Sequence, residues 1–293
     1  MKTVIMKFLG LYINVLALVV PRYAEGFGLK LFCRPFRGKM TPRQKEFLQS
    51  AKQFSFAYRK ETIAGYRWGN GAKKILLVHG WQSHSYRWKV YVEQLIKHNC
   101  SVLAFDAPGH GLSTGDFLSV PLYSEVIEKM ILHSGKPDVI IGHSLGGFSS
   151  LYTVHRNPSL SPDKLVVMAA PGEAVEFFEF YKTSLGLSQR SMDLIIKRFK
   201  KFFNHGPEYF SGSKFASTIT IPGLIIHDED DEETSVEHSK RVHSKWINSR
   251  LHITKGFGHN LKSTEVVKEV VQFIESTTAY STSRNPTSSF HNL

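Results

Sequence analysis

A serine between two glycines is the residue of this chain best suited to covalent chemistry. Gly142, Ser144 and Gly146 form a Gly-x-Ser-x-Gly pattern directly after the apolar run 139–141. The β-branched residues of that run favour a short buried strand, and apolar residues at helical spacing after Ser144 favour a helix. A serine at such a strand-to-helix turn is typical of a nucleophile elbow, because flanking glycines let neighbouring backbone approach it closely. The pattern predicts that Ser144 is a nucleophile.

A serine hydroxyl becomes a good nucleophile only with a base that takes its proton and an acid that orients the base. The C-terminal third of the chain contains candidates for both, each shortly after an apolar run that predicts a strand. His259 lies in a glycine-lined loop and is the candidate base. The acidic segment 227–233 contains three candidate acids, Asp228, Asp230 and Asp231. Together these residue types would support acyl transfer through an acyl-enzyme.

Four stretches in this order resemble the α/β-hydrolase superfamily, in particular its single-domain esterase/lipase-like and serine-aminopeptidase-like members. They are Leu-Val-His-Gly-Trp at 77–81, Asp-Ala-Pro-Gly-His-Gly at 106–111, Gly-His-Ser-Leu-Gly-Gly at 142–147, and the pair formed by the Asp231 loop and Gly258-His259. The resemblance covers roughly residues 55–275. It implies an acid four residues after a His-Gly step that ends a strand, and His227 to Asp231 has this spacing. Asp228 stands where the family often has glycine, so Asp231 is favoured and Asp230 and Asp228 are the alternatives.

The resemblance also implies an oxyanion hole made of two backbone N–H groups. One belongs to Leu145, the residue after the nucleophile, and the other to Trp81, the residue after a His-Gly step. Because the donors are backbone groups, the Trp81 side chain would shape the substrate pocket rather than the hole. His79 and His143 correspond to histidines that are usually structural in the family, so neither is included in the candidate triad.

The expected function is that of a serine hydrolase that cleaves a carboxylic ester of an apolar or small acyl group, with the candidate triad Ser144, Asp231 and His259. A serine in place of an aspartate nucleophile argues against dehalogenase or epoxide-hydrolase chemistry. Thioesterase, lactonase, amidase and acyltransferase activities remain open on the same triad. The alternative from another class is a non-catalytic ligand-binding protein of the same fold, and the presence of all three triad residues argues against it. We expect no cofactor and no metal, since the acidic segment lacks the spacing of an EF-hand loop.

Strand and helix patterns alternate through most of the chain. This predicts a mostly parallel, twisted eight-stranded α/β-hydrolase sheet with helices on both faces. Two alternating segments, 54–58 and 63–68, predict an antiparallel hairpin ahead of that pattern. The remaining strands are expected at 74–79, 101–105, 138–142, 164–169, 221–226 and 251–254, and helices at about 86–98 and 120–134, after Ser144 and from about Ser263.

The alternation stops at about 172–220, where the family inserts a cap on the active-site side. Two amphipathic stretches, 174–181 and 191–203, predict a small helical cap there. Its aromatic residues either pack the cap or line an acyl pocket, and the candidate pocket residues are Trp81, Phe177, Phe178 and Tyr181. The expected division is an N-terminal helical segment at 1–50, a hydrolase domain at 51–276 and a disordered Ser/Thr-rich tail at 277–293.

The chain has 293 residues, of which 42% are hydrophobic, and a formal net charge of +12. Cys33 and Cys100 lie far apart and form no Cys-x-x-Cys motif, so neither a disulfide framework nor a thiol metal site is indicated. Basic residues gather at 30–60 and 197–201, where solvated helix faces are the first explanation and an anionic membrane surface the second. With no nucleic-acid-binding motif, we expect no nucleic-acid partner.

Residues 3–20 form the most apolar stretch, which Lys7 and Asn14 interrupt and Pro21 ends. Its length is marginal for a helix that spans a bilayer. A helix docked on the protein or lying on a membrane is favoured over a signal anchor and over a signal peptide with a poor cleavage site near Ala24. We therefore expect a cytoplasmic protein with peripheral membrane association through this segment, with a signal anchor or export as the alternatives. The oligomeric state is not predicted.

Overall fold

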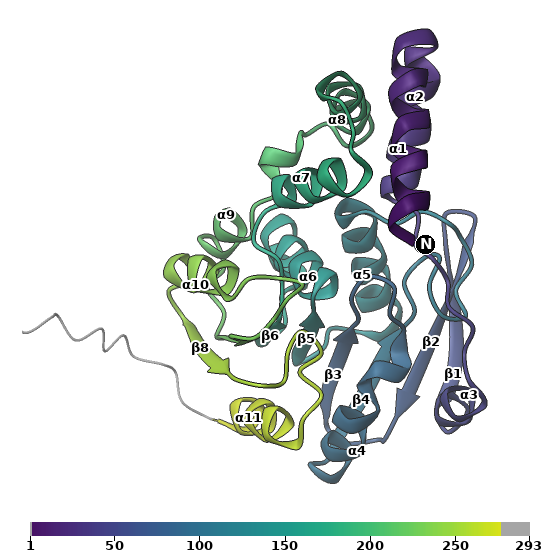
Figure 1. The fold of residues 1–293 in the computed structure, drawn as a ribbon. Coiled ribbons are helices and arrows are strands. Elements are labelled where there is room, and N and C mark those ends of the chain that lie inside the picture. Colours follow the sequence, from purple (N-terminus) through teal and green to yellow (C-terminus); the bar gives the residue numbers. More distant parts are fainter. Residues whose placement is uncertain (1, 277–293) are drawn as a thin grey trace, which may run out of the picture.

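A computed structural model describes residues 2–276, which form an eight-stranded sheet surrounded by helices (Figure 1). The strands are β1 Lys52–Tyr58, β2 Glu61–Trp68, β3 Lys73–Val78, β4 Cys100–Phe105, β5 Val139–His143, β6 Lys164–Met168, β7 Gly223–Asp228 and β8 Ser249–Thr254. Their order across the sheet is β1-β2-β4-β3-β5-β6-β7-β8. β2 is antiparallel to β1 and β4, and the other neighbouring strands are parallel. The predicted mostly parallel eight-stranded sheet is confirmed.

Helices cover both faces of the sheet, because its central strands carry apolar side chains on both sides. In β3, Leu76 and Val78 belong to one hydrophobic core, and Ile75 and Leu77 belong to the other. The first core includes side chains of α5 Val120–Ser134, α6 Leu145–Arg156, α9 Gly212–Ala216 and α10 Val236–Lys245. The second includes side chains of α3 Pro42–Gln49, the 3-10 turn η1 Ser85–Trp88, α4 Lys89–Lys97 and α11 Thr264–Glu275.

The insertion between β6 and β7 is helical, and its first two helices lie at one end of the molecule (Figure 1). It consists of α7 Ala174–Leu185, α8 Gln189–Phe203, the 3-10 turn η3 Pro207–Tyr209 and α9, and a further 3-10 turn, η2 Pro158–Leu160, precedes β6. α7 and α8 include the two stretches that were predicted as helices, 174–181 and 191–203. Because β6 is parallel to β5, this insertion leaves the sheet at the same edge as the turn that carries Ser144.

The N-terminal segment forms two helices, α1 Lys2–Val19 and α2 Pro21–Phe32. Pro21 ends the apolar stretch but not the helical structure, because α2 starts at this residue. Proline is well suited to the first turn of a helix, where its missing N–H leaves no hydrogen bond unmade. α1 packs against α2, α7 and α8. Among the described residues, no helix is long and apolar enough to cross a membrane. The tail predicted as disordered, 277–293, lies outside the described residues.

Candidate active site

Ser144 occupies the sharp turn between β5 and α6. Its backbone dihedral angles are φ 52° and ψ −126°, in a region that residues with a side chain adopt at a cost in strain. The two flanking glycines are required sterically. A Cβ on Gly142 would lie 2.6 Å from the Gly147 Cα, and a Cβ on Gly146 would lie 2.3 Å from the Val78 carbonyl oxygen. Ser144 thus lies in a strained strand-to-helix turn that leaves no room for a side chain at either flanking glycine.

The loop after β3 lies directly against Ser144. A Cβ on Gly80 would come within 2.8 Å of the Ser144 Cβ, so the backbone that leads into Trp81 passes beside the candidate nucleophile. On the other side of Ser144, Leu145 is the first residue of α6, and N–H groups in the first turn of a helix have no acceptor within the helix. The two backbone N–H groups proposed for an oxyanion hole thus belong to the segments next to Ser144.

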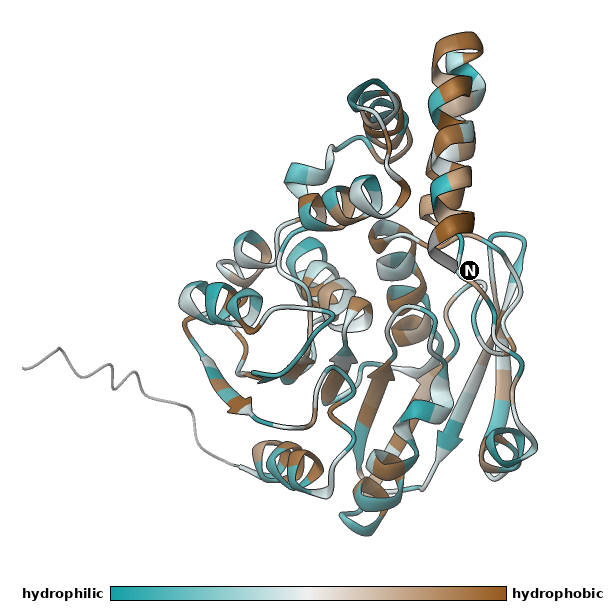
Figure 2. Ribbon diagram, in the orientation of Figure 1, coloured by the Kyte–Doolittle hydropathy of each residue, from teal (hydrophilic) through white to brown (hydrophobic). Residues whose placement is uncertain are grey.

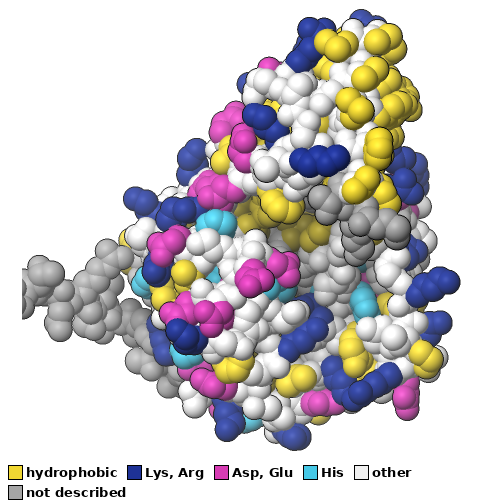
Figure 3. Space-filling model, in the orientation of Figure 1, with side chains coloured by type: hydrophobic (Ala, Val, Ile, Leu, Met, Phe, Trp, Pro, Cys, Tyr) yellow, Lys and Arg dark blue, Asp and Glu magenta, His cyan; other side chains and the backbone are white. Residues whose placement is uncertain are grey.

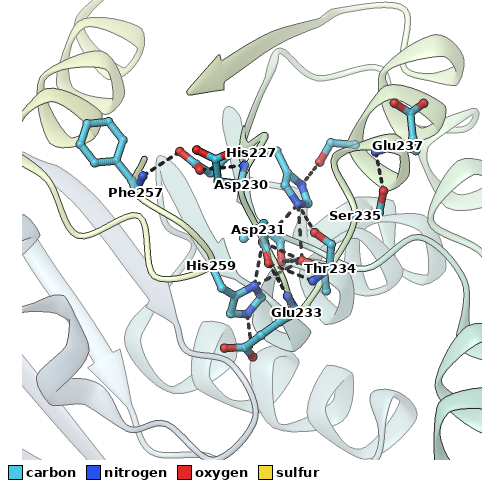
Figure 4. Close-up of polar contacts among 12 residues, drawn as sticks. His227, Asp230, Asp231, Glu233, Thr234, Ser235, Glu237, Phe257 and His259 are labelled. Atoms are coloured by element: carbon cyan, nitrogen blue, oxygen red, sulfur yellow. Dashed lines mark hydrogen bonds and ion pairs between the residues drawn. The ribbon is translucent and has the colours of Figure 1, made fainter. Parts of the chain in front are cut away.

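Asp231 and His259 form a largely buried pair (Figure 4). The Asp231 Oδ2 lies 2.9 Å from the His259 Nδ1, and the two side chains are 0% and 11% exposed. Asp231 follows β7 and His259 follows β8, and these strands are parallel neighbours, so both loops leave the sheet at one edge. This arrangement leaves Nε2 of His259 as the ring nitrogen available for proton transfer.

Hydrogen bonds hold the Asp231 carboxylate in its charged form. Its Oδ1 accepts from the backbone N–H of Glu233 at 2.8 Å and of Thr234 at 2.9 Å, and its Oδ2 accepts from the Thr234 Oγ1 at 2.9 Å. The Nε2 of buried His227 lies 3.2 Å from the same Oδ2. Burial raises the pKa of Asp231, but the hydrogen bonds from His227, His259 and Thr234 outweigh burial and lower the pKa well below its usual value.

The carboxylates of the two alternative acids, Asp228 and Asp230, accept hydrogen bonds from other residues. The Asp228 Oδ2 accepts from the Thr254 Oγ1 at 2.7 Å and from the Phe257 N–H at 3.0 Å. The Asp230 Oδ2 accepts from the Gly256 N–H at 3.1 Å. Both carboxylates therefore tie the acidic loop to the loop after β8, and Asp231 is the one of the three that bonds to the imidazole of His259.

His259 contacts His143, the residue that precedes the candidate nucleophile in the chain. The Nε2 of His143 and the carbonyl oxygen of His259 are 2.7 Å apart, and the two rings are in edge contact with centroids 4.9 Å apart. Within the described residues, no hydrogen bond joins the Ser144 hydroxyl to His259, and the Glu233 Oε2 lies 3.7 Å from the His259 Nε2. Catalytic hydrogen bonds are often long before a substrate is bound, so this geometry is compatible with a triad.

Sequence reasoning missed the residues that support the pair. The sequence indicated His227 only through its spacing to Asp231, and the direct contact between the two side chains follows from the fold of the loop after β7. Arg87 had no signal in the sequence. Its guanidinium is buried, lies over the Trp88 ring and donates from Nη2 to the Asn260 carbonyl oxygen at 3.0 Å. Burial lowers the pKa of Arg87 to about 10. Arg87 therefore holds the backbone next to His259.

His79 and His143 have contacts typical of structural histidines. The Nε2 of His79 accepts from the Ala107 N–H at 2.9 Å, and its Nδ1 lies 2.7 Å from the Gly80 carbonyl oxygen, so the ring joins the loops after β3 and β4. Burial lowers the pKa of both histidines well below the usual value, which keeps both rings neutral. These contacts favour leaving both out of the triad.

The aromatic pocket candidates differ in their surroundings. Trp81 and Phe177 are half-buried. Phe178 and Tyr181 are buried against Phe32 of α2, with ring centroids 4.4 and 5.0 Å away, and the Tyr181 hydroxyl donates to the Gly28 carbonyl oxygen at 2.9 Å. Phe178 and Tyr181 thus join α7 to α2, and a role for any of the four in a substrate pocket stays a prediction.

Comparison with known proteins identifies the family. Residues 75–259 match the model of the alpha/beta hydrolase family, and the chain belongs to this family. It is 26% identical over 260 residues to a bifunctional esterase/perhydrolase of Acinetobacter calcoaceticus, covering 71% of this chain and 94% of that protein. It is 27% identical over 184 residues to an esterase of Mycobacterium tuberculosis, covering 61% of this chain and 56% of that protein.

The fold is also found among solved structures. A crystal structure of a putative lipase from Acinetobacter baumannii superposes with a TM-score of 0.63 at 19% sequence identity, covering 81% of this chain and 97% of that one. At this identity the likeness concerns the fold alone. The family and the esterase relatives together support a hydrolase that acts on esters.

Proposed function

We propose that the chain is a serine hydrolase that cleaves carboxylic esters through an acyl-enzyme, with Ser144 as nucleophile, His259 as base and Asp231 as the acid that orients the base. The observation that carries the proposal is the 2.9 Å contact between the Asp231 Oδ2 and the His259 Nδ1 at the same sheet edge as the strained Ser144 turn. A pair of this kind fixes the tautomer of the imidazole, so that its Nε2 is free to accept a proton.

In the proposed reaction, the Ser144 Oγ forms a bond to the carbonyl carbon of the ester while its proton passes to the His259 Nε2. The N–H groups of Leu145 and Trp81 stabilise the oxyanion that develops. When the tetrahedral intermediate collapses, the bond to the alkoxy oxygen breaks, and the leaving alcohol takes the proton from His259. Water then attacks the acyl-enzyme by the reverse sequence, which releases the acid and restores the Ser144 hydroxyl.

An apolar acyl group is the proposed specificity, and peripheral association with membranes through the N-terminal segment is part of the same proposal. The aromatic residues of the insertion and the esterase relatives support the acyl specificity. The exposed apolar side chains of α1 support the membrane association. Thioesters, lactones and amides are the other substrates that the same residues could attack, and acyl transfer to another acceptor would use the same acyl-enzyme.

A fluorophosphonate probe tests the mechanism directly, because it phosphonylates an activated serine. We expect labelling of the wild-type protein and none of the Ser144→Ala variant, which should lose at least about 10³-fold in kcat toward p-nitrophenyl esters. The control is Ser159→Ala, which changes an exposed serine and should label as wild type does. A folded wild-type protein that neither labels nor hydrolyses a panel of esters of varied chain length would point to the non-catalytic ligand-binding alternative.

A further inference from the structure

α1 is predominantly apolar, yet much of its apolar surface is exposed. Gly10, Ile13 and Ala17 face the protein. Eight apolar side chains on the opposite side are 47% to 72% exposed: Val4, Ile5, Phe8, Leu11, Tyr12, Val15, Leu18 and Val19. At about 100° per residue, these eight positions fill one continuous arc of about 140°, in which the Tyr12 hydroxyl is the one polar group. We call this surface the α1 arc; Figures 2 and 3 show hydrophobic residues along α1.

The orientation of the arc is fixed by the polar residues of α1, which bind the cap. The Lys7 Nζ donates to the Thr183 carbonyl oxygen at 2.9 Å. The Asn14 side chain donates to the Gly186 carbonyl oxygen at 3.0 Å and accepts from the Ser188 N–H at 2.8 Å. Rotating α1 to bury the arc would break these hydrogen bonds and turn Gly10, Ile13 and Ala17, which are now buried, toward solvent. The outward position of the arc is therefore built into the contacts between α1 and the cap.

An exposed surface of this size is unusual for a protein that works alone in water. Large contiguous apolar patches on a protein surface mark interaction sites. Each of the eight side chains would gain free energy from leaving water, in proportion to the area it buries. The α1 arc thus has the properties of a docking surface.

The charges around the arc favour an anionic partner. Residues 1–40 include seven basic residues, against Glu25 as the one acidic residue. Three exposed basic residues border α1: Lys7 lies on α1 next to the arc, Arg22 lies just past its end, and the Arg190 Nε donates to the Ala17 carbonyl oxygen at 2.9 Å. If a second copy of this chain docked on the arc, two such basic margins would come together and repel each other, since each chain has a net charge of +12. Anionic lipid headgroups would instead be attracted to them.

We infer that the α1 arc docks on an anionic lipid bilayer, with its apolar side chains at the boundary of the acyl chains and its basic margin among the headgroups. This inference rests on the proposed peripheral association with membranes. It specifies which surface of the protein binds the membrane and that the lipids are anionic. Since α1 packs on α7 and α8, docking would bring the cap side of the molecule, and with it the edge of the sheet that carries Ser144, toward the bilayer.

Vesicle co-sedimentation tests the inference with a matched pair of double variants. Phe8→Gln with Leu18→Gln removes two arc residues that are 67% and 70% exposed. Leu132→Gln with Ile247→Gln changes two apolar residues of the same exposure, 67% and 69%, outside the N-terminal helices. Because all four side chains are exposed, both variants should fold, which circular dichroism checks. All proteins carry Ser144→Ala as well, so that binding is measured without hydrolysis.

We expect binding to vesicles of phosphatidylcholine with phosphatidylserine, weaker binding to phosphatidylcholine alone, and further weakening at high salt. The Phe8/Leu18 variant should bind at least about tenfold more weakly, and the Leu132/Ile247 variant as tightly as its parent. Equal binding by both variants would overturn the inference that the α1 arc is the docking surface, and would leave the proposed membrane association in place. No binding by the parent protein would overturn both, and arc-dependent dimers in sedimentation velocity without vesicle binding would assign the arc to a second copy instead.

Discussion

The acidic loop after β7 contains aspartates with two different structural roles within four residues. Asp228 ends the strand and accepts hydrogen bonds from Thr254 and Phe257, so it fastens the loop after β8. Asp231 accepts from the loop itself and from His259. In the proposed mechanism only Asp231 acts on the imidazole, whereas Asp228 sets where the His259 loop lies. The two carboxylates should therefore respond differently to the same substitution.

Asp231→Asn should lower kcat by about 10³- to 10⁴-fold, because an amide in place of the carboxylate favours the wrong tautomer of His259 and cannot stabilise the imidazolium. Asp228→Asn should keep kcat within a few-fold. It should lower the free energy of unfolding by about 1–3 kcal/mol, since one of its hydrogen-bonded donors loses its acceptor. Ester turnover and urea unfolding of both variants measure these effects. A severe loss of turnover in Asp228→Asn with Asp231→Asn nearly unaffected would refute the assignment.

At the level of elements, the N-terminal helices are joined to the cap by close contacts that depend on small residues. A Cβ on Gly10 would lie 1.9 Å from the carbonyl oxygen of Leu185 at the end of α7, so glycine lets α1 lie against α7. A Cβ on Gly28 of α2 would lie 2.5 Å from the Ile195 side chain of α8. The helix pair α1 and α2 is thus an integral part of the cap layer.

Gly10→Ala should therefore weaken the docking of α1, with an overpacking cost of about 1–3 kcal/mol. Amide hydrogen exchange of α1 should become faster, and the thermal unfolding temperature should fall. Gly26→Ala is the matched control in α2: its added Cβ would meet nothing within 4 Å, and alanine favours a helix interior over glycine by about 1 kcal/mol. If the two variants exchange and melt alike, the close contact between α1 and α7 does not hold α1 in place.

On the scale of the whole molecule, buried neutral histidines make folding sensitive to acid. Burial lowers the pKa of His110 to about 4 and the pKa of His79 and His143 well below the usual value. In the unfolded chain each would titrate near 6.5. Below that pH the unfolded chain binds protons that the folded protein does not, so stability falls as the pH falls. The lowered pKa of Asp231 adds a second loss of stability at a pH below about 4, where the unfolded aspartate takes up its proton.

We expect the free energy of unfolding to decrease between pH 6.5 and 4, and His110→Gln to make this decrease shallower by up to about 1.4 kcal/mol per pH unit, the contribution of one proton. Urea unfolding at several pH values measures the slope, which is independent of any constant loss of stability that the substitution causes. Parallel curves for wild type and His110→Gln over this range would show that His110 is not a source of the acid sensitivity.

The sheet and the turn at Ser144 were predictable from local patterns in the sequence. Strand and helix patterns depend on the alternation of apolar residues along the chain, and the glycines around Ser144 are required by contacts with Gly147 and with the adjacent β3 backbone. His259 was also predictable as the candidate base, because it follows a strand in a glycine-lined loop. Each of these features depends on residues close together in sequence or on a motif with fixed spacing.

The packing of distant segments, in contrast, selected which aspartate meets His259 and which side of α1 faces water. The family resemblance favours Asp231 through its four-residue spacing from His227 but leaves Asp228 and Asp230 as alternatives. The path of the loops after β7 and β8 separates the partners of the three. α1 carries apolar residues around most of its circumference. The close approach of Gly10 to Leu185 and the hydrogen bond of Asn14 to Gly186 decide which of them face the protein, through contacts with residues more than 170 positions away. The contact of Arg87 with the Asn260 backbone is equally distant in the chain. Such contacts depend on how elements pack in three dimensions, which local patterns do not encode.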